Sequence, residues 1–202
     1  MKLLKKAFAF TFIFMLSVSG LTGYQVNASE EQKHLDILFT HDLHSHLNSF
    51  QTIVDGTQQE TGGFARLKTL INEHEKENTD TLILDGGDFS MGTLIQTVYD
   101  TEAAELRMLG YLGCDVTTLG NHEFDYTLDY IQKQLSSTGM SGKVVLSNVT
   151  NVNTGAHIWA ENKIITKKLV TESGKTISVK VGLIGETVPT LAKKRTNYTG
   201  VL

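Results

Sequence analysis

Three short apolar segments of this sequence each run directly into a cluster of histidine, aspartate or asparagine residues. The segments are "LDILFT" at 35–40, "DTLILD" at 80–85 and "DVTTLG" at 115–120, and the clusters that follow contain "HDLHSH", "GGDFSMG" and "NHEFD". Short apolar segments between turn signals indicate strands, the third of them the weakest. In open α/β sheets, reactive groups gather beyond the carboxyl ends of the strands, so all three clusters are expected along one edge of the sheet.

Segments with helical periodicity separate these strands. Apolar residues recur at Phe64, Leu67, Leu70 and Ile71 with charged residues on the opposite face. Asp100 occupies the expected N-cap position of a second helix. The predicted helices are residues 63–78, 100–113 and 127–137, and a fourth strand is predicted at 143–149. This alternation predicts βαβ units, a largely parallel sheet between helices, and therefore an α/β fold.

The carboxyl-terminal part of the sequence has a different pattern. Residues 162–170 and 175–185 flank "TESG" and predict a β-hairpin whose second strand continues as a buried strand. No internal repeat or low-complexity tract is present.

The first 28 residues have the composition of a secretory signal. Lys2, Lys5 and Lys6 precede the apolar stretch "AFAFTFIFMLSV", and Val26 and Ala28 provide the small residues of a cleavage site. The apolar stretch is shorter than the roughly 20 residues of a membrane span. We therefore expect residues 1–28 to be a cleaved signal peptide, an uncleaved anchor being the alternative. The mature protein would be residues 29–202, secreted or periplasmic, without a stable membrane span.

Charge and cysteine content exclude two further classes. Loss of residues 1–28 removes three lysines and no acidic residue, so the formal net charge changes from -4 to -7. Binding of a nucleic-acid duplex requires a basic face, and the acidic balance argues against it. Cys114 is the only cysteine, so no intrachain disulfide stabilises the protein. Core packing, helped by metal binding, must replace it.

The first two clusters contain candidate metal ligands. If the first strand continues far enough, Asp42 and His44 project to the same side, and a carboxylate beside an imidazole suits Zn, Mn or Fe better than Ca or Mg. His41 is then expected to point away, and His46 joins the pair only if the strand has not turned. In the second cluster, two glycines deliver Asp88, whose two carboxylate oxygens could bridge two cations. Asp85 is expected to have a turn role.

The third cluster combines a neutral ligand with acid–base chemistry. Asn121 offers an amide oxygen to a metal pair, whereas His122 points elsewhere and suits a proton donor or transition-state stabiliser. Asp125, three residues later, is placed to hydrogen-bond the imidazole and to orient it.

The three motifs, in the order D-x-H, G-D-x-x-x-G and G-N-H-E, resemble the calcineurin-like metallophosphoesterases. Within that family, "THDLHSH", "TGGFARLKTLI", "LDGGDFSMGT", "LGNHEFDY" and "VGLIGETVP" look like the exported 5'-nucleotidase and 2',3'-cyclic-nucleotide phosphodiesterase branch. The resemblance covers residues 35 to 190. It implies a layered fold of β-sheets flanked by helices, and a nucleotide or related small phosphate ester as substrate.

The resemblance also implies specific roles for the candidate residues. Asp42, His44, Asp88 and Asn121 would bind two divalent cations, and His122 and Asp125 would form the catalytic dyad. Hydrolysis would use hydroxide generated on the metal pair. The sequence leaves the native metal, the exact substrate and the oligomeric state open.

The family pattern is incomplete in this sequence. The later G-H and H-x-H motifs are missing, and His157 is the only histidine after His122. The expectation is therefore an amino-terminal portion of a catalytic domain with an uncovered sheet edge, and the alternative function is a catalytically incompetent fragment that binds metal or a partner. A third alternative is a metal-dependent amidohydrolase, suggested by the His44 and His46 spacing but disfavoured by the G-N-H-E motif.

Overall fold

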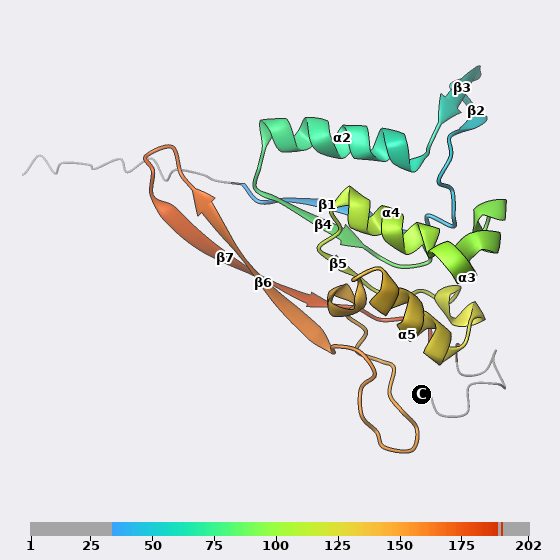
Figure 1. Cartoon of the computed structure of the whole chain (residues 1–202). Helices are drawn as coiled ribbons and strands as arrows, with labels where there is room; N and C mark the ends of the chain where they lie inside the picture. The colour runs from blue at the N-terminus through green and yellow to red at the C-terminus, as the bar shows by residue number, and fades with distance from the viewer. Residues whose placement is uncertain (1–33, 190, 192–202) are drawn as a thin grey trace, which may run out of the picture. The chain divides into compact units, whose positions relative to one another are not determined.

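The three apolar segments form one parallel sheet in the order β1-β4-β5 (Figure 1). β1 (Asp36–Thr40) pairs along its whole length with β4 (Thr81–Asp85), and β4 pairs at its carboxyl end with β5 (Val116–Thr117). This computed structural model describes residues 34–189 and Leu191, so the expected signal peptide at 1–28 lies outside the described residues. The predicted α/β class and parallel sheet are confirmed.

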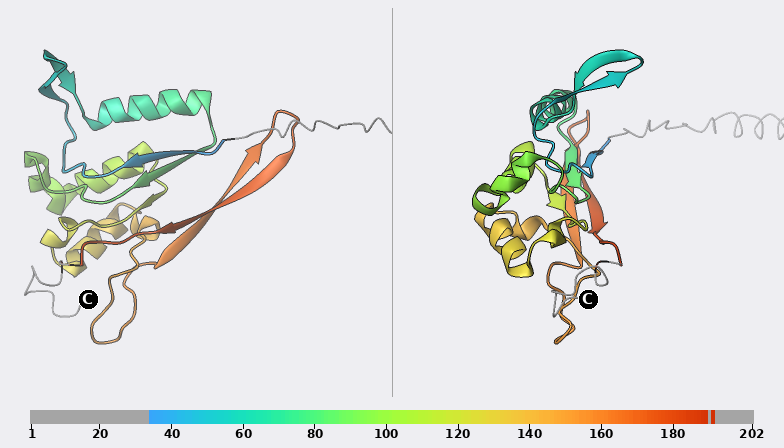
Figure 2. Two further views of the ribbon diagram at one scale, coloured as in Figure 1. Left: turned by 180° about the vertical axis from the view of Figure 1, so that it is seen from behind. Right: turned by 90° about the vertical axis from the view of Figure 1, so that its right-hand side faces the viewer.

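Helices cover one face of this sheet, and the long β6–β7 hairpin lies on its other side (Figure 2). The helices are α2 (Phe64–Glu77), α4 (Ala104–Leu112) and α5 (Leu128–Ser137), close to the predicted ranges. Each turns an apolar stripe inward, which includes Ile71 in α2, Leu109 in α4 and Ile131 in α5. Thr127 caps α5, because its side chain accepts from Tyr130 N.

The helix predicted at 100–113 is interrupted. The short helices η1 (Leu94–Val98) and α3 (Tyr99–Glu102) precede Ala103, which has a left-handed backbone with φ 47° and separates α3 from α4. Asp100 therefore lies inside α3 and is not an N-cap, contrary to the prediction. Tyr99 and Leu106, on either side of the break, are both fully buried.

The strand predicted at 143–149 is absent. The short helix η3 (Ser141–Lys143) leads into an irregular segment with single bridges from Val144 to Thr117 and from Val145 to Ala160. Val144 and Val145 are nevertheless buried. The apolar pattern thus reported burial correctly, but a buried segment need not form a strand ladder.

Two hairpins project from the layers. β6 (Asn162–Val170) and β7 (Thr176–Ile184) form the predicted antiparallel hairpin. The expectation that its second strand is buried is wrong, because exposed and half-buried residues alternate along β7 and Ile184 is 74% exposed. β2 (Phe50–Val54) and β3 (Thr57–Thr61) form a second one that was not predicted. Its turn is Asp55-Gly56 with φ values of 50° and 75°, the left-handed pair that favours a two-residue hairpin, so the Asp-Gly dipeptide was the missed signal.

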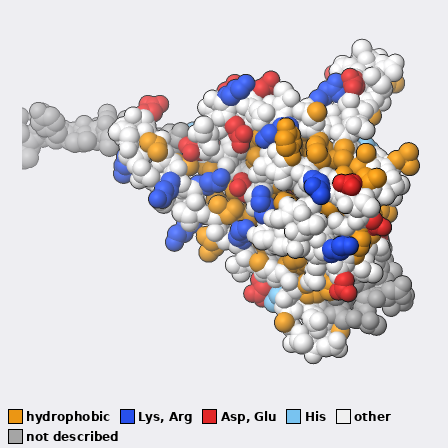
Figure 3. Space-filling model, viewed as in Figure 1, with side chains coloured by type: hydrophobic (Ala, Val, Ile, Leu, Met, Phe, Trp, Pro, Cys, Tyr) orange, Lys and Arg blue, Asp and Glu red, His pale blue; other side chains and the backbone are white. Residues whose placement is uncertain are grey.

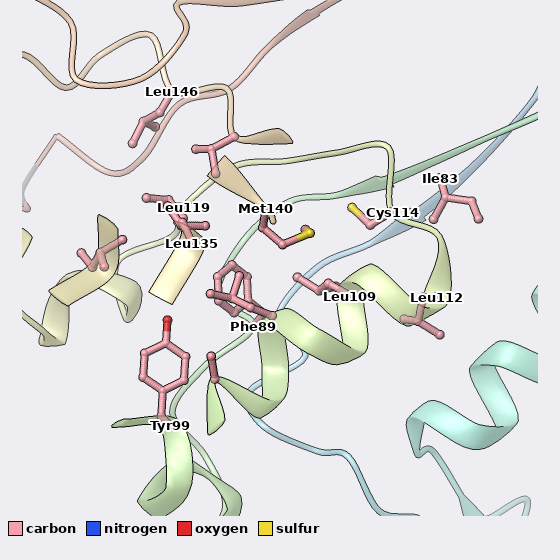
Figure 4. Packing of buried hydrophobic residues seen from close by; sticks show 14 of the residues in the cluster. Ile83, Phe89, Tyr99, Leu109, Leu112, Cys114, Leu119, Leu135, Met140 and Leu146 are labelled. Atoms are coloured by element: carbon pink, nitrogen blue, oxygen red, sulfur yellow. The ribbon is translucent and has the colours of Figure 1, made fainter. Parts of the chain in front are cut away.

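The hydrophobic core lies between the sheet and the helices (Figure 4). Phe89, Tyr99 and Leu109 are each at most 1% exposed, and Cys114 belongs to the same buried cluster. Burial raises the pKa of the Cys114 thiol to about 12, so this cysteine is a core residue without thiolate character. The opposite face of β1 is more open, since Ile37 and Phe39 are 52% and 64% exposed.

Two further observations concern the exposed hydrophobic side chains and the helices that could cross a membrane. Hydrophobic side chains reach the surface beside charged ones on the face shown in Figure 3, as expected because apolar atoms contribute much of the exposed area of folded proteins in general. Within the described ranges, 34–189 and 191, no helix combines the length and the apolar composition that a membrane crossing requires.

Asp85 joins all three strands at their carboxyl ends. Thr40 Oγ1 of β1 donates to Asp85 Oδ2 at 2.7 Å, and Thr117 Oγ1 of β5 donates to Asp85 Oδ1 at 2.8 Å. Gly87 N also donates to Oδ1 at 3.0 Å, which gives Asp85 the turn role expected of it. Burial raises the pKa of Asp85, although the three donors act in the opposite direction.

We predict that Asp85→Asn preserves folding at pH 7, whereas Asp85→Ala destabilises by roughly 1–3 kcal/mol for each donor left unpaired. An amide keeps the Oδ1 acceptor, and the Thr40 hydroxyl can accept from the new N–H. Because the folded pKa is raised, the wild type binds more protons when folded, so its stability falls as pH rises from the ordinary aspartate pKa through the raised value. Urea unfolding across this pH range should show that fall in the wild type and a smaller one in Asp85→Asn.

Candidate metal centre

Three loops at the carboxyl ends of the strands carry the candidate residues. They are the first loop (41–45) after β1, the second loop (86–91) after β4 and the third loop (118–125) after β5. The first two run side by side and are joined by backbone hydrogen bonds: Asp42 N to Gly87 O at 3.1 Å, and His44 N to Asp88 O at 3.0 Å. Ser45 N continues this pairing to Phe89 O at 2.9 Å. These three backbone hydrogen bonds therefore fix the register between the first and second loops.

Asp42 and His44 approach each other, but for a different reason from the one predicted. β1 ends at Thr40, and both residues have left-handed backbones, with φ values of 54° and 44°. The expected strand alternation is therefore wrong here. Asp42 Oδ1 and His44 Nε2 are 3.7 Å apart, because the loop curls the two side chains together.

The neighbouring histidines occupy different surroundings. His41 Nδ1 lies 3.0 Å from Asp42 Oδ2, so His41 contacts the pair although it was expected to point away. Its ring also stacks on Phe39. His46 is exposed, and its ring meets Phe50 edge-on at a centroid distance of 5.7 Å.

Asp42, His44 and Asp88 form a group with metal-ligand geometry. One ligand atom from each lies within 4.8 Å of the others. The Nδ1 atom of His44 donates to the carbonyl oxygen of Met91 at 2.9 Å, which leaves Nε2 as the acceptor on the side of Asp42. Metal-binding histidines commonly have this arrangement, in which the far nitrogen donates to a backbone carbonyl. Two carboxylates and an imidazole fit a divalent transition metal.

The second and third loops touch so closely that two glycines are required. A Cβ atom at Gly87, whose φ is 85°, would lie 2.5 Å from Gly120 N. A Cβ atom at Gly120 would overlap Asp88 Oδ1 and lie 2.6 Å from Asp88 N. This contact places Asp88 Oδ1 where it accepts from His122 N at 2.8 Å. The glycines of both motifs are therefore explained by the approach of the two loops.

His122 and Asp125 form the pair that the sequence suggested. His122 Nδ1 and Asp125 Oδ2 are 2.8 Å apart within the 3-10 helix η2 (Glu123–Asp125) and its N-cap. A carboxylate accepts, so Nδ1 carries the hydrogen and Nε2 is the free nitrogen in the neutral ring. The His122 ring meets that of His44 edge-on at 5.2 Å. Asn121 is half-buried between Gly120 and His122.

Glu123 is a site component that the sequence reasoning missed. It is completely buried and accepts hydrogen bonds from Asp88 N, Ser90 N, Ser90 Oγ and Gly120 N. Burial raises the pKa of Glu123, and the charge of Asp88 adds to this, while the donors from Ser90 and Gly120 lower it. The available signal was its place as the last residue of the G-N-H-E motif, directly after His122.

The model of the family described as calcineurin-like phosphoesterase matches residues 35–190. The chain belongs to this family. Membership confirms the resemblance inferred from the three motifs, and it fits the α/β fold and the metal-ligand group. Calcineurin-like phosphoesterases use divalent metals, and Asp42, His44 and Asp88 are this member's candidate ligands.

Individual relatives agree with the family. The chain is 29% identical over 198 residues to a 2',3'-cyclic-nucleotide 2'-phosphodiesterase/3'-nucleotidase of Yersinia enterocolitica, covering 94% of this chain and 30% of the relative. It is 32% identical over 189 residues to mouse (Mus musculus) 5'-nucleotidase, covering 91% and 31%. The crystal structure of the calcineurin-like phosphoesterase YfkN from Bacillus subtilis matches with a TM-score of 0.68 and 28% identity, covering 83% of this chain and 53% of that one.

These matches confirm the metallophosphoesterase fold expected from the sequence. The chain spans between 11% and 32% of the length of the curated relatives it matches. The match to YfkN likewise leaves about half of that structure outside the aligned part.

We predict that Gly120→Ala weakens divalent-metal binding by about tenfold or more, because the new methyl group displaces Asp88. Gly120 and Gly142 both lack a positive φ, so alanine strains neither backbone. Gly142 has no atom within 4 Å of an added Cβ, which makes Gly142→Ala the matched control. Calorimetric titration with Mn²⁺ should separate the two variants; equal affinities would contradict the steric explanation.

Proposed function

We propose that this protein is a metal-dependent hydrolase of phosphate esters that acts on nucleotides. The observation that supports this most directly is the gathering of Asp42, His44 and Asp88 beside the His122–Asp125 pair. A ligand group suited to a cation and a histidine oriented by a carboxylate are the two components that phosphoester hydrolysis needs. The names of the relatives, a 5'-nucleotidase and a 2',3'-cyclic-nucleotide phosphodiesterase, favour nucleotides over other esters.

We further propose that the site holds two divalent cations of Zn, Mn or Fe. Asp42, His44, Asp88 and Asn121 would hold these cations, the first three through the ligand group described above. When bound, the cations would supply Lewis acidity toward the phosphoryl oxygens and lower the pKa of water. The hydrogen bond from His44 Nδ1 to Met91 O supports this role, since it fixes Nε2 as the available ligand atom.

His122 is proposed to stabilise the phosphoryl group during the reaction or to protonate the leaving oxygen. Asp125 holds the hydrogen on Nδ1, so that a second proton on Nε2 would make the ring a cationic donor. The backbone N–H of His122 donates a hydrogen bond to Asp88 Oδ1, which holds the imidazole close to the proposed metal ligands. Such a donor strengthens its interaction as negative charge accumulates on the phosphoryl oxygens.

Two further proposals concern the division of the chain into segments and the cellular location of the protein. Residues 1–28 are proposed to be a signal peptide, and residues 29–202 an amino-terminal portion of the catalytic domain. The protein is accordingly proposed to act outside the cytoplasm on a small nucleotide substrate.

A second candidate function is metal binding without turnover. His157, the one histidine after His122 in the sequence, forms an ion pair with Glu161 in a region separate from the three loops. The described ligand group therefore contains a single histidine, His44. This donor set suits cation binding even if it supports no hydrolysis.

The two candidates predict different outcomes in one assay. With Mn²⁺ added, a phosphoesterase hydrolyses bis-p-nitrophenyl phosphate and releases phosphate or a nucleoside monophosphate from nucleotide substrates, and chelation by EDTA abolishes both activities. Stoichiometric Mn²⁺ binding without either activity would favour the second candidate. Hydrolysis that persists after chelation and dialysis would contradict the metal-dependent mechanism.

We predict that His122→Ala lowers kcat by about 10²–10⁴-fold while leaving the bound metal content unchanged, because His122 is proposed to act on the phosphoryl group and not as a ligand. His157→Ala is the control, since it also removes a partly exposed histidine paired with a carboxylate. Metal analysis by mass spectrometry should accompany the kinetics. Parallel loss of metal and activity in His122→Ala would place His122 among the ligands.

A further inference from the structure

The carboxylate of Glu123 accepts four hydrogen bonds within the site. Its Oε2 atom accepts from Gly120 N at 2.7 Å and from Asp88 N at 2.9 Å. Its Oε1 atom accepts from Ser90 Oγ at 2.8 Å and from Ser90 N at 3.0 Å. The side chain is 0% exposed. All four partners donate, so both oxygens act purely as acceptors.

These four donors come from two separate loops. Asp88 and Ser90 belong to the second loop, and Gly120 belongs to the third, which also carries Glu123 itself. Their sequence separations from Glu123 are 35, 33 and 3 residues. Glu123 therefore binds the backbone of the second loop from the third loop, at the point where the Gly87–Gly120 contact leaves no room for another side chain.

A reciprocal hydrogen bond closes this arrangement. The side chain of Glu123 accepts from the backbone of Asp88, and the side chain of Asp88 accepts from the backbone of His122 at 2.8 Å. Asp88 has a left-handed backbone with φ 51°, a conformation that non-glycine residues adopt only when the surroundings impose it. The Glu123 hydrogen bond to Asp88 N is one of the contacts that impose it.

The hydrogen bonds of Glu123 also affect the orientation of His44. Ser90, which donates twice to Glu123, has a carbonyl oxygen 3.3 Å from His44 Nδ1. The next carbonyl, that of Met91, accepts from the same Nδ1 at 2.9 Å. By fixing residues 88–91, Glu123 thus sets the position of Asp88 directly and the orientation of the His44 ring through two carbonyl groups.

We propose that Glu123 is a positioning residue of the metal centre: a buried carboxylate that aligns Asp88, His44 and His122 without binding the cation. This inference rests on the proposed function of the site, and it names the residue that assembles it. Glutamine cannot replace it, because the amide N–H₂ group would face either the Ser90 donors or the Asp88 and Gly120 donors. If the amide faces Ser90, the Ser90 hydroxyl can accept from it but Ser90 N loses its acceptor; if it is turned the other way, both Asp88 N and Gly120 N lose theirs.

The test compares Glu123→Gln with Glu105→Gln in the full chain. Glu105 is also 0% exposed, but its carboxylate accepts one side-chain hydrogen bond, from Ser45 Oγ, which a glutamine can retain. Mn²⁺ binding is followed by electron paramagnetic resonance, whose free-ion signal falls as the cation binds. We expect Glu123→Gln to weaken Mn²⁺ binding by about 10–100-fold and Glu105→Gln to leave it within about threefold of the wild type.

Thermal unfolding of the metal-free proteins distinguishes positioning from stability. A purely structural residue would lower Tm and leave the Mn²⁺ affinity of the folded protein unchanged. If Glu123→Gln does not fold, Ser90→Ala removes only one of the four donors, and a several-fold weaker affinity at near-normal Tm is expected. Wild-type affinity in a folded Glu123→Gln protein, or in Ser90→Ala if that is the variant available, would overturn the inference.

The experiment also separates this inference from the proposed function. If the wild type binds Mn²⁺ but hydrolyses no phosphate ester, the proposed function fails, and the affinity comparison still decides the role of Glu123. If the wild type binds no Mn²⁺, both are overturned, since there is no metal centre to position.

Discussion

The contact between the second and third loops is the constraint on which the site depends. Gly87 and Gly120 let the two backbones approach to a distance that no side chain would permit. Only at this separation do Asp88 Oδ1 and His122 N meet, and only then does the Glu123 carboxylate reach the Asp88 and Ser90 amides. A site assembled from distant segments thus owes its precision to two positions that carry no functional group.

Buried apolar side chains also hold the second and third loops in position. Phe89 directly follows Asp88 and Leu119 precedes Gly120 (Figure 4). Phe124 follows Glu123, and all three side chains are at most 1% exposed. Polar groups therefore alternate with buried anchors in both loops. Left-handed backbones at Asp42 and Asp88 cost of order 1–3 kcal/mol each, and such anchoring is what allows them to persist. Packing and site geometry are consequently coupled along the same few residues.

The sequence predicted the sheet and the candidate residues better than the local geometry that joins them. The apolar composition of β1 and β4, each bounded by turn residues, located both strands, and the order of the motifs indicated a common edge. It did not reveal that Asp42 and His44 meet through a left-handed loop, since φ values depend on neighbouring segments. Glu123 was missed for a related reason: its partners lie 33 and 35 residues away, and burial of a carboxylate leaves no periodic pattern.

Electrostatics explains why such a site calls for a cation. Asp42, Asp88 and the buried Glu123 lie in adjoining loops, and in the described part of the chain neither lysine nor arginine forms an ion pair with any of them. Backbone amides offset part of this charge, but the charge of Asp88 still adds to the burial that raises the pKa of Glu123. A divalent cation among Asp42, His44 and Asp88 would neutralise this repulsion, and binding to the folded state alone would stabilise that state. Metal affinity and folding stability should therefore be linked in this protein.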